Sequence, residues 1–173
     1  MTFDRYCALA QRTSNPNLTT REHLVNGALG LCGEAGEVAD LIKKHKMQGH
    51  ALDVQKILEE VGDVLWYCAE IATHMKLFAS WDNIYQSVID ISTEADRLEL
   101  LAVRLCSKAG TIAEKVVYSR PIHEDICEIM FICKTIAGNW GYHIIEVAEN
   151  NIKKLQRRYP VKFDPERSIN REV

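Results

Sequence analysis

The chain has 173 residues, of which 47% are apolar and 26% are charged, and its net charge is −3. This length and composition are typical of one globular domain with a substantial core. The slight negative charge gives no general attraction to nucleic acid or to an anionic membrane surface. The first residues, MTFDRYCALAQ, lack the pattern of a secretory signal, and no apolar run approaches the roughly 20 residues that span a bilayer. We therefore expect a cytoplasmic protein that binds neither nucleic acid nor membrane.

Apolar residues recur at three- and four-residue intervals along most of the chain, which predicts an all-α fold. The expected helices cover about 20–46, 53–78, 83–118, 122–138 and 142–158, with a short helix near the N-terminus. Asp53 follows the loop MQGHAL and is a suitable N-cap for the second long helix. The tail YPVKFDPERSINREV has the composition of turns, and no segment shows the alternating pattern of a strand.

Cysteine and histidine residues do not form a recognisable metal-binding pattern. The six cysteines include no CxxC pair and lie among apolar residues, so we expect small buried thiols rather than disulfides or zinc ligands. The six histidines form neither HxxxH nor HExxH, so the sequence predicts no histidine-based metal site.

Two blocks of the sequence recur in the same order. LCGEAGEVAD (31–40) resembles LCSKAGTIAE (105–114), and EVGDVLWYCAEIA (60–72) resembles DICEIMFICKTIA (125–137). The two halves therefore look like a duplicated helical hairpin, with chance similarity between amphipathic helices as the alternative. We expect a single domain over 1–173, with a first hairpin at about 20–78, a second at about 95–141, and a C-terminal helix and tail at 142–173.

The second copy has lost part of the acidic pattern and is expected to be degenerate. Lys108 and Thr111 stand at the positions of Glu34 and Glu37, whereas Glu60 and Asp63 correspond to Asp125 and Glu128. We expect Lys108 to form a buried ion pair with one of these two acids. Loss of Lys108 would then leave an uncompensated charge that costs several kcal/mol.

Two acidic pairs stand out because their neighbours are small or apolar. Glu34 and Glu37 are three residues apart, as are Glu60 and Asp63, so each pair lies on one side of a helix. Four carboxylates that converge between two helices would repel each other strongly unless a divalent cation lay among them. Oxygen ligands of this kind suit Mg²⁺ or Mn²⁺. On the residues alone, a metal site and two solvated acidic helix faces both remain open.

Glycines accompany both acidic pairs. Gly36 and Gly62 lie next to the acidic residues, and glycine inside a helix costs about 1 kcal/mol relative to alanine. We expect both to permit a close approach of helix backbones.

Three segments resemble the signature blocks of the MazG-like, all-α nucleoside triphosphate pyrophosphohydrolases, a superfamily that includes dimeric dUTPases and dCTP pyrophosphatases. These segments are LVNGALGLCGEAGEVADLIKKHKMQGH, EEVGDVLWYCAEIA and AENNIKKLQRRYPVKFDPERSINRE. The family pattern is ExxE, a spacer and ExxD. Gly33 stands where the first motif often has an additional Glu. The resemblance covers roughly 1–78 and 142–173, and the intervening segment resembles the second hairpin of duplicated members.

The resemblance implies Mg²⁺-dependent hydrolysis of a nucleoside triphosphate to the monophosphate and pyrophosphate, with Mn²⁺ as a substitute. It implies that Glu34, Glu37, Glu60 and Asp63 bind the metal, with Glu34 or Glu37 as the general base for the attacking water. Asp40 is expected to support this site. The expected nucleotide contacts are Asn26, Lys43, Trp66, Asn151, Lys154 and Arg171. For Trp66, a place in the core is the alternative.

Several alternatives stay open at this point. The likeness to phage members favours a purine substrate such as dGTP, with dUTP or dCTP as the pyrimidine alternative. A helical module that binds a nucleotide without hydrolysing it, and a purely structural bundle, are the non-enzymatic readings. The second copy would take the place that a partner subunit has in single-hairpin relatives, and we expect chains to associate further through apolar helix faces into a homodimer or homotetramer.

Overall fold

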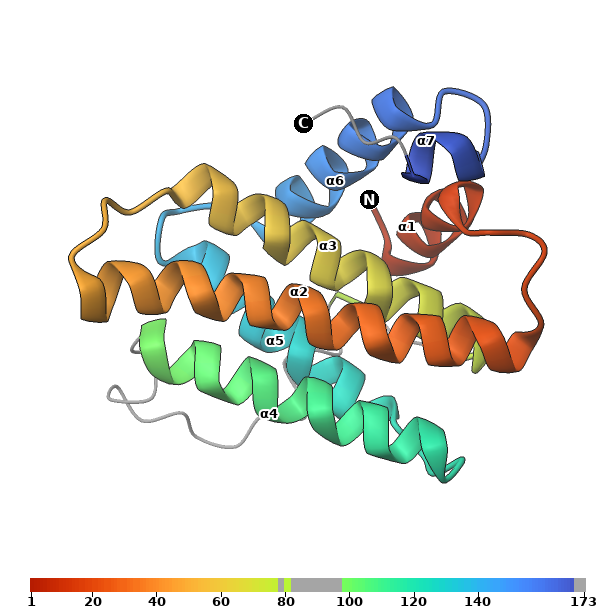
Figure 1. The fold of residues 1–173 in the computed structure, drawn as a ribbon, viewed down its shortest axis with the longest axis horizontal. Coiled ribbons are helices and arrows are strands. Elements are labelled where there is room, and N and C mark those ends of the chain that lie inside the picture. Colours follow the sequence, from red (N-terminus) through yellow and green to blue (C-terminus); the bar gives the residue numbers. More distant parts are fainter. Residues whose placement is uncertain (78–79, 82–97, 170–173) are drawn as a thin grey trace.

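The computed structural model describes residues 1–77, 80–81 and 98–169 (Figure 1). Within these residues the chain forms seven α-helices and one short 3-10 helix, without a strand. The elements are α1 (Phe3–Ala10), η1 (Gln11–Thr13), α2 (Thr20–Gln48), α3 (Val54–His74), α4 (Leu98–Val117), α5 (His123–Gly138), α6 (Ile144–Arg158) and α7 (Pro165–Ile169). The predicted all-α class is therefore confirmed for the described part of the chain.

The long helices agree closely with the sequence prediction, with two differences. The helix expected at 83–118 is seen as α4 from Leu98 onward, and its expected first part lies outside the described residues. The tail, expected to contain only turns, includes the five-residue helix α7. Pro165 suits a first helical position, and the side chain of Asp164 accepts a hydrogen bond from the backbone N–H of Glu166. Such local capping is enough for one short turn of helix without an apolar period.

Side chains and glycine define the ends of the first hairpin. Thr19 and Glu22 form a capping box at the start of α2, in which each side chain binds the other residue's backbone N–H. Gly49 ends α2 with a φ of 75°, a conformation that glycine adopts without strain. Asp53 accepts a hydrogen bond from the N–H of Lys56 at 2.9 Å, so its predicted role as the N-cap of α3 is confirmed.

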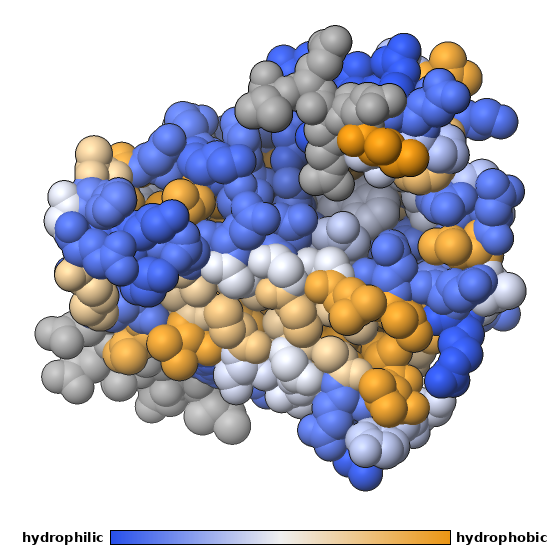
Figure 2. All heavy atoms as spheres, in the orientation of Figure 1, coloured by the Kyte–Doolittle hydropathy of each residue, from blue (hydrophilic) through white to orange (hydrophobic). Residues whose placement is uncertain are grey.

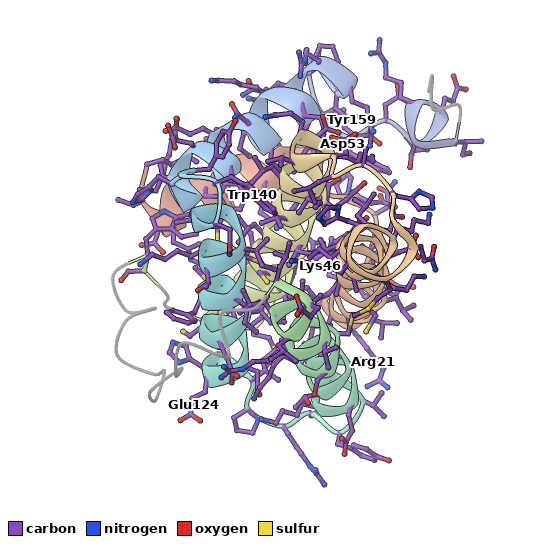
Figure 3. All side chains as sticks on the ribbon, turned by 90° about the vertical axis from the view of Figure 1, so that its left-hand side faces the viewer. Arg21, Lys46, Asp53, Glu124, Trp140 and Tyr159 are labelled. Carbon is purple, nitrogen blue, oxygen red and sulfur yellow. The ribbon has the colours of Figure 1, made fainter. Side chains whose placement is uncertain are left out.

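Four helices surround a common core. Helix α2 packs against α3 and α4, and α5 packs against the same two helices, so the order around the bundle is α2, α3, α5, α4 (Figures 1 and 3). Each helix contributes fully buried side chains, such as Leu31, Leu65, Leu105 and Ile132. Helices α1 and α6 lie across α3 on the outer side of the bundle (Figure 1). Burial of these apolar faces is the main force that holds the hairpins together.

Close helix approach depends on one of the two expected glycines and on two others. A Cβ atom at Gly27 would lie 2.6 Å from Ile71, and one at Gly30 would lie 2.1 Å from Tyr67, so these glycines let α2 and α3 meet. Gly62 behaves as predicted, because a Cβ there would lie 3.0 Å from Cβ of Asn151 on α6. The prediction for Gly36 is wrong: among the described residues, no atom outside the adjoining part of its own helix lies within 4 Å of the position of its Cβ.

The six cysteines are free thiols, as expected from their spacing. Three of them are buried, namely Cys68, Cys127 and Cys133, and the other three are half-buried. None of the helices in the described residues is long and apolar enough to cross a membrane.

Candidate active site

Three of the four predicted carboxylates converge between α2 and α3. Oxygen atoms of Glu34, Glu37 and Glu60 all lie within 4.8 Å of one another. Glu60 is buried, Glu34 is half-buried and Glu37 is exposed, so the group is open on one side only. The three-residue spacing on α2 places its two carboxylates on the side that faces α3. This is a set of hard oxygen ligands of the kind that divalent cations bind.

The electrostatics of the cluster are unfavourable without a cation. Burial is the main reason that the pKa of Glu34 is raised from 4.5 to about 7. The negative charges of Asp63, Glu60 and Glu37 raise the pKa of Glu34 further. A carboxyl group with this pKa is about half protonated near neutral pH and can give up or accept a proton there.

Asp63 lies beside the cluster but has other partners. Its two carboxylate oxygens accept hydrogen bonds from Asn151 at 2.7 Å and from Lys154 at 2.5 Å, both on α6. Asn151 is buried, and its side-chain oxygen accepts a hydrogen bond from the hydroxyl of Tyr6 at 3.0 Å. A chain of buried polar groups therefore runs from α1 through α6 and fixes the orientation of Asp63.

Lys56 balances part of the negative charge. Its ammonium group lies 2.6 Å from Glu60, one helical turn further along α3, and 4.0 Å from Glu59. Hydrogen bonding to Glu60 is the main cause that raises the pKa of Lys56, against a smaller lowering by burial. Because Lys56 is half-exposed on the rim of the site, its side chain can also turn toward an anionic ligand.

A cleft of about 510 Å³ surrounds the carboxylates. It is bounded by α2, α3, α6, the segment before α2 and the segment after α6, and Figure 2 shows a hollow on this face above α2. Of the six predicted nucleotide contacts, all but Arg171 lie in the described residues, and three of them line the cleft: Asn26, Trp66 and Lys154. A fourth, Asn151, lies behind Asp63 and contacts it directly.

Trp66 lies at the boundary between the core and the cleft. Its ring is half-buried and packs against the core, and its indole N–H donates a hydrogen bond to Thr13 at 3.0 Å. The ring also lines the cleft and meets Tyr67 edge to face, with ring centroids 4.9 Å apart. An aromatic wall therefore stands next to the acidic cluster.

The structure separates two other predicted residues from the cleft. Lys43 is not among the residues that line it and forms an ion pair with Asp40 at 2.5 Å. Asp40 also pairs with Lys44 at 2.6 Å, so both of its carboxylate oxygens are engaged by surface lysines. These pairs hold the pKa of Asp40 at about 2, below its usual value. Arg171 lies outside the described residues.

Several residues that line the cleft escaped the sequence analysis. They are Thr13, Asn15, Leu18, Lys56, Glu59, Tyr67, Leu155, Arg158, Tyr159, Phe163 and Ser168. The place of Lys56 could have been predicted, because it stands four residues before Glu60 on the same helix, a spacing that favours an ion pair. The others come from three separate segments, and only the packing of α6 and its tail against α3 brings them together.

The corresponding positions of the second hairpin hold an ion-pair network. Lys108 lies 2.7 Å from Glu128 and 3.5 Å from Asp125, so the expected pairing is confirmed, but the side chain of Lys108 is 28% exposed rather than buried. Each acid has a further cation: Arg104 lies 2.6 Å from Glu128, and Lys115 lies 2.5 Å from Asp125. Lysine and arginine therefore pair with both acids here, whereas the acidic charge around Glu34 is only partly balanced by Lys56 and Lys154.

Comparison with known proteins points to one family. Residues 24–89 match the family model of the MazG nucleotide pyrophosphohydrolase domain. The chain is also similar to the gene 37 protein of Mycobacterium phage L5, with 36% identity over 56 residues that cover 30% of this chain and 49% of that protein. The aligned part thus spans about half the length of this curated relative. No solved structure matches the chain significantly.

The family match confirms the resemblance seen in the first two sequence blocks. It includes all four acidic residues of the predicted ExxE and ExxD motifs. The expected continuation of the resemblance over 142–173 lies outside the matched residues.

Proposed function

We propose that this chain, whose residues 24–89 match the family model of the MazG nucleotide pyrophosphohydrolase domain, hydrolyses a nucleoside triphosphate to the monophosphate and pyrophosphate. The observation that carries the proposal is the convergence of Glu34, Glu37 and Glu60 within 4.8 Å inside a cleft of about 510 Å³. A structural helix bundle has no need for three carboxylates that repel each other in this way.

The donor set fits Mg²⁺, with Mn²⁺ as a substitute. Glu34, Glu37 and Glu60 would hold the ion through their oxygens, and Asp63 lies next to them. Burial and the neighbouring negative charges raise the pKa of Glu34, and a divalent cation bound among these carboxylates would lower it again. The bound ion would neutralise negative charge on the phosphate oxygens as the anhydride bond breaks.

The protein's own side chains supply the remaining steps. We assign Glu34 as the general base that takes the proton of the attacking water, with Glu37 as the alternative, because Glu34 lies deeper in the cluster than the exposed Glu37. Lys56, Lys154 and Arg158 line the cleft and would attract the triphosphate. Their charges are within reach of the cluster, as the ion pairs of Lys56 and Lys154 demonstrate.

The base would lie against the aromatic wall of the cleft. Trp66 and Tyr67 offer flat apolar surfaces next to the acids, and Asn26 offers an amide for hydrogen bonds to a base or sugar. We favour a purine such as dGTP, on the likeness of the chain to phage members of the family, and keep dUTP and dCTP as the alternative. Lys43 and Arg171 stay predictions from the family resemblance.

We further propose that the second hairpin is a degenerate copy of the first within one domain. In support, α2 packs against α4 and α3 packs against α5, so that equivalent helices are neighbours. The repeated cysteines, Cys32 and Cys106, are close enough that one thiol affects the pKa of the other. One chain would then carry one catalytic metal site.

An apolar surface supports association of the chain into a homodimer or homotetramer. Leu29 on α2 and Val103 on α4 are 69% and 68% exposed, and Val25 and Leu100 are also exposed on these helices. Figure 2 shows hydrophobic residues along the face formed by α2 and α4. Analytical ultracentrifugation tests this directly, and a monomer at all concentrations would contradict it.

The decisive experiment measures pyrophosphate release from a panel of nucleoside triphosphates, with Mg²⁺, with Mn²⁺ and with a chelator. We expect metal-dependent formation of monophosphate and pyrophosphate. We expect Glu37→Gln to abolish this activity while the helical circular dichroism is unchanged, because Glu37 is exposed and its replacement removes a charge that repels Glu34 and Glu60. Glu99→Gln, a change of a half-buried acid on α4, is the control.

Two outcomes would overturn the assignment. Formation of diphosphate and orthophosphate would show that a different bond is cleaved. Tight nucleotide binding without turnover of any triphosphate would favour the binding-module alternative.

A further inference from the structure

A second group of metal-binding side chains lies at the other end of the first hairpin. His23 near the start of α2 meets Glu70 and His74 near the end of α3, where Figure 1 shows the two helices side by side. Each of the three residues offers one potential ligand atom, and these three atoms all lie within 4.8 Å of one another. Glu70 is completely buried, and the side chain of His23 is 8% exposed. This group shares no residue with the carboxylate cleft.

One nitrogen in this group has no partner. Nε2 of His74 is buried and makes no hydrogen bond within the described part of the chain. The nearest acidic oxygen, Oε1 of Glu70, lies 3.9 Å away, which is beyond hydrogen-bond distance. By contrast, Nδ1 of His23 lies 2.6 Å from the same oxygen. A buried polar atom without a partner is rare in folded proteins and calls for a missing ligand or a functional reason.

We propose that His23, Glu70 and His74 bind a transition-metal ion such as Zn²⁺, at a site separate from the carboxylate cleft. Two imidazoles and one carboxylate are a common zinc ligand set, whereas the oxygen-only cluster at Glu34 suits Mg²⁺. Ligand atoms around a tetrahedral Zn²⁺ lie about 3.3 Å apart, given metal–nitrogen bonds of about 2.0–2.1 Å. The two contacts to Oε1 of Glu70, at 2.6 and 3.9 Å, lie on either side of this value.

Metal binding requires one ring to turn. The imidazoles of His23 and His74 are stacked with centroids 3.7 Å apart and planes 12° apart, so one ion cannot lie in the plane of both. The ring of His74 is the one that can rotate, because no hydrogen bond holds its Nε2. His74 is also near the C-terminal end of α3, where the side chain is 19% exposed and an ion can enter.

The site would stabilise the segment that forms one wall of the cleft. The hydroxyl of Ser14 donates to one oxygen of Glu70 at 2.8 Å, and the side-chain amide of Gln11 donates to the other at 2.7 Å. Thr13 and Asn15, in the same segment, line the carboxylate cleft. An ion that fixes Glu70 therefore also fixes this wall, which gives the site a structural role.

The test uses the full chain after treatment with a chelator, in excess Mg²⁺ so that the carboxylate cluster is occupied. Zn²⁺ is titrated in competition with a coloured chelator, and the melting temperature is recorded in parallel. We expect one Zn²⁺ per chain that Mg²⁺ does not displace, together with a higher melting temperature. Substitution of Co²⁺ should give the strong visible absorption of a four-coordinate site.

Three variants locate the ion. His74→Phe keeps a stacked ring and removes the nitrogens, so it should lose Zn²⁺ binding. His50→Ala changes an exposed histidine and should retain it, as should Glu37→Gln in the carboxylate cleft. Binding that survives in His74→Phe but is lost in Glu37→Gln would overturn the proposal, as would the absence of Zn²⁺ binding to the wild-type chain.

A measurement on the wild-type chain covers the case in which His74→Phe does not fold. Nuclear magnetic resonance of the six histidine rings is followed as Zn²⁺ is added. We expect the signals of two rings to shift with saturation at one equivalent. Equal shifts at all rings, or none, would contradict a site built from two histidines.

Discussion

The side-chain amide of Asn151 on α6 donates a hydrogen bond to Asp63 on α3, with 2.7 Å between nitrogen and oxygen. The sequence suggested Asn151 as a nucleotide contact, but its amide oxygen is engaged as well, by the hydroxyl of Tyr6. Asn151 is only 4% exposed, so its contribution is to hold Asp63 beside the carboxylate cluster.

We therefore expect Asn151→Ala to lower both stability and activity. The change removes one partner from the buried hydroxyl of Tyr6 and one from the half-buried carboxylate of Asp63, and the loss at a fully buried group costs about 1–3 kcal/mol. Urea denaturation and pyrophosphate release check the two effects. Asn150→Ala, at an exposed position of the same helix, is the matched control and should change neither. A fully stable, fully active Asn151→Ala variant would contradict the positioning role.

The pKa of Glu34 predicts how the stability of the metal-free protein depends on pH. The pKa is about 7 in the folded chain and near 4.5 in the unfolded chain, so the folded state binds more protons between these values. The free energy of unfolding should therefore fall as pH rises from about 4.5 through 7, and stay low above it. Glu34→Gln should remove this part of the slope and be more stable than the wild type at pH above 7.

Urea denaturation in the presence of a chelator, at several pH values, measures this slope. Addition of Mg²⁺ should flatten the wild-type curve, because the cation favours the charged carboxylates. Identical slopes for the wild type and Glu34→Gln would show that Glu34 titrates normally.

The ion pairs of the second hairpin predict a smaller effect of Lys108→Met than the sequence alone suggests. Removal of Lys108 leaves Glu128 paired with Arg104, and Asp125 paired with Lys115, so neither acid loses all compensation. We expect a loss of about 1 kcal/mol, as for a partly exposed pair. The double variant Lys108→Met, Arg104→Met leaves Glu128 without a cation and should lose more than the sum of the two single changes. Strict additivity in urea denaturation would contradict this coupling.

The glycines of α2 predict opposite effects of the same substitution. Gly30→Ala places a methyl group 2.1 Å from the ring of Tyr67, so the ring must move, and we expect lower stability and altered substrate affinity. Gly36→Ala meets no atom within 4 Å and should raise stability by about 0.5–1 kcal/mol, through the better helix propensity of alanine. Thermal melting compares the two, and destabilisation by both would show that propensity is outweighed at Gly36 by a contact outside the described residues.

The sequence by itself determined the helices and the acidic motifs. Apolar periodicity and local caps such as Asp53 are short-range features, so the limits of α2, α3, α5 and α6 follow from nearby residues. The spacing of Glu34 and Glu37 sets their common direction in the same way. The ion pair of Lys108 could also be predicted, because it follows from aligning one repeat with the other.

Only the tertiary structure decided which side chains share a site. It placed Lys43 with Asp40 rather than in the cleft, and it gave Asp63 partners on a helix about 90 residues away in sequence. It likewise brought His23 to His74, although no sequence pattern links them. These contacts depend on how whole helices pack against each other. The apolar period of a single helix indicates which of its faces is buried, but it does not indicate which residues of another helix that face will contact.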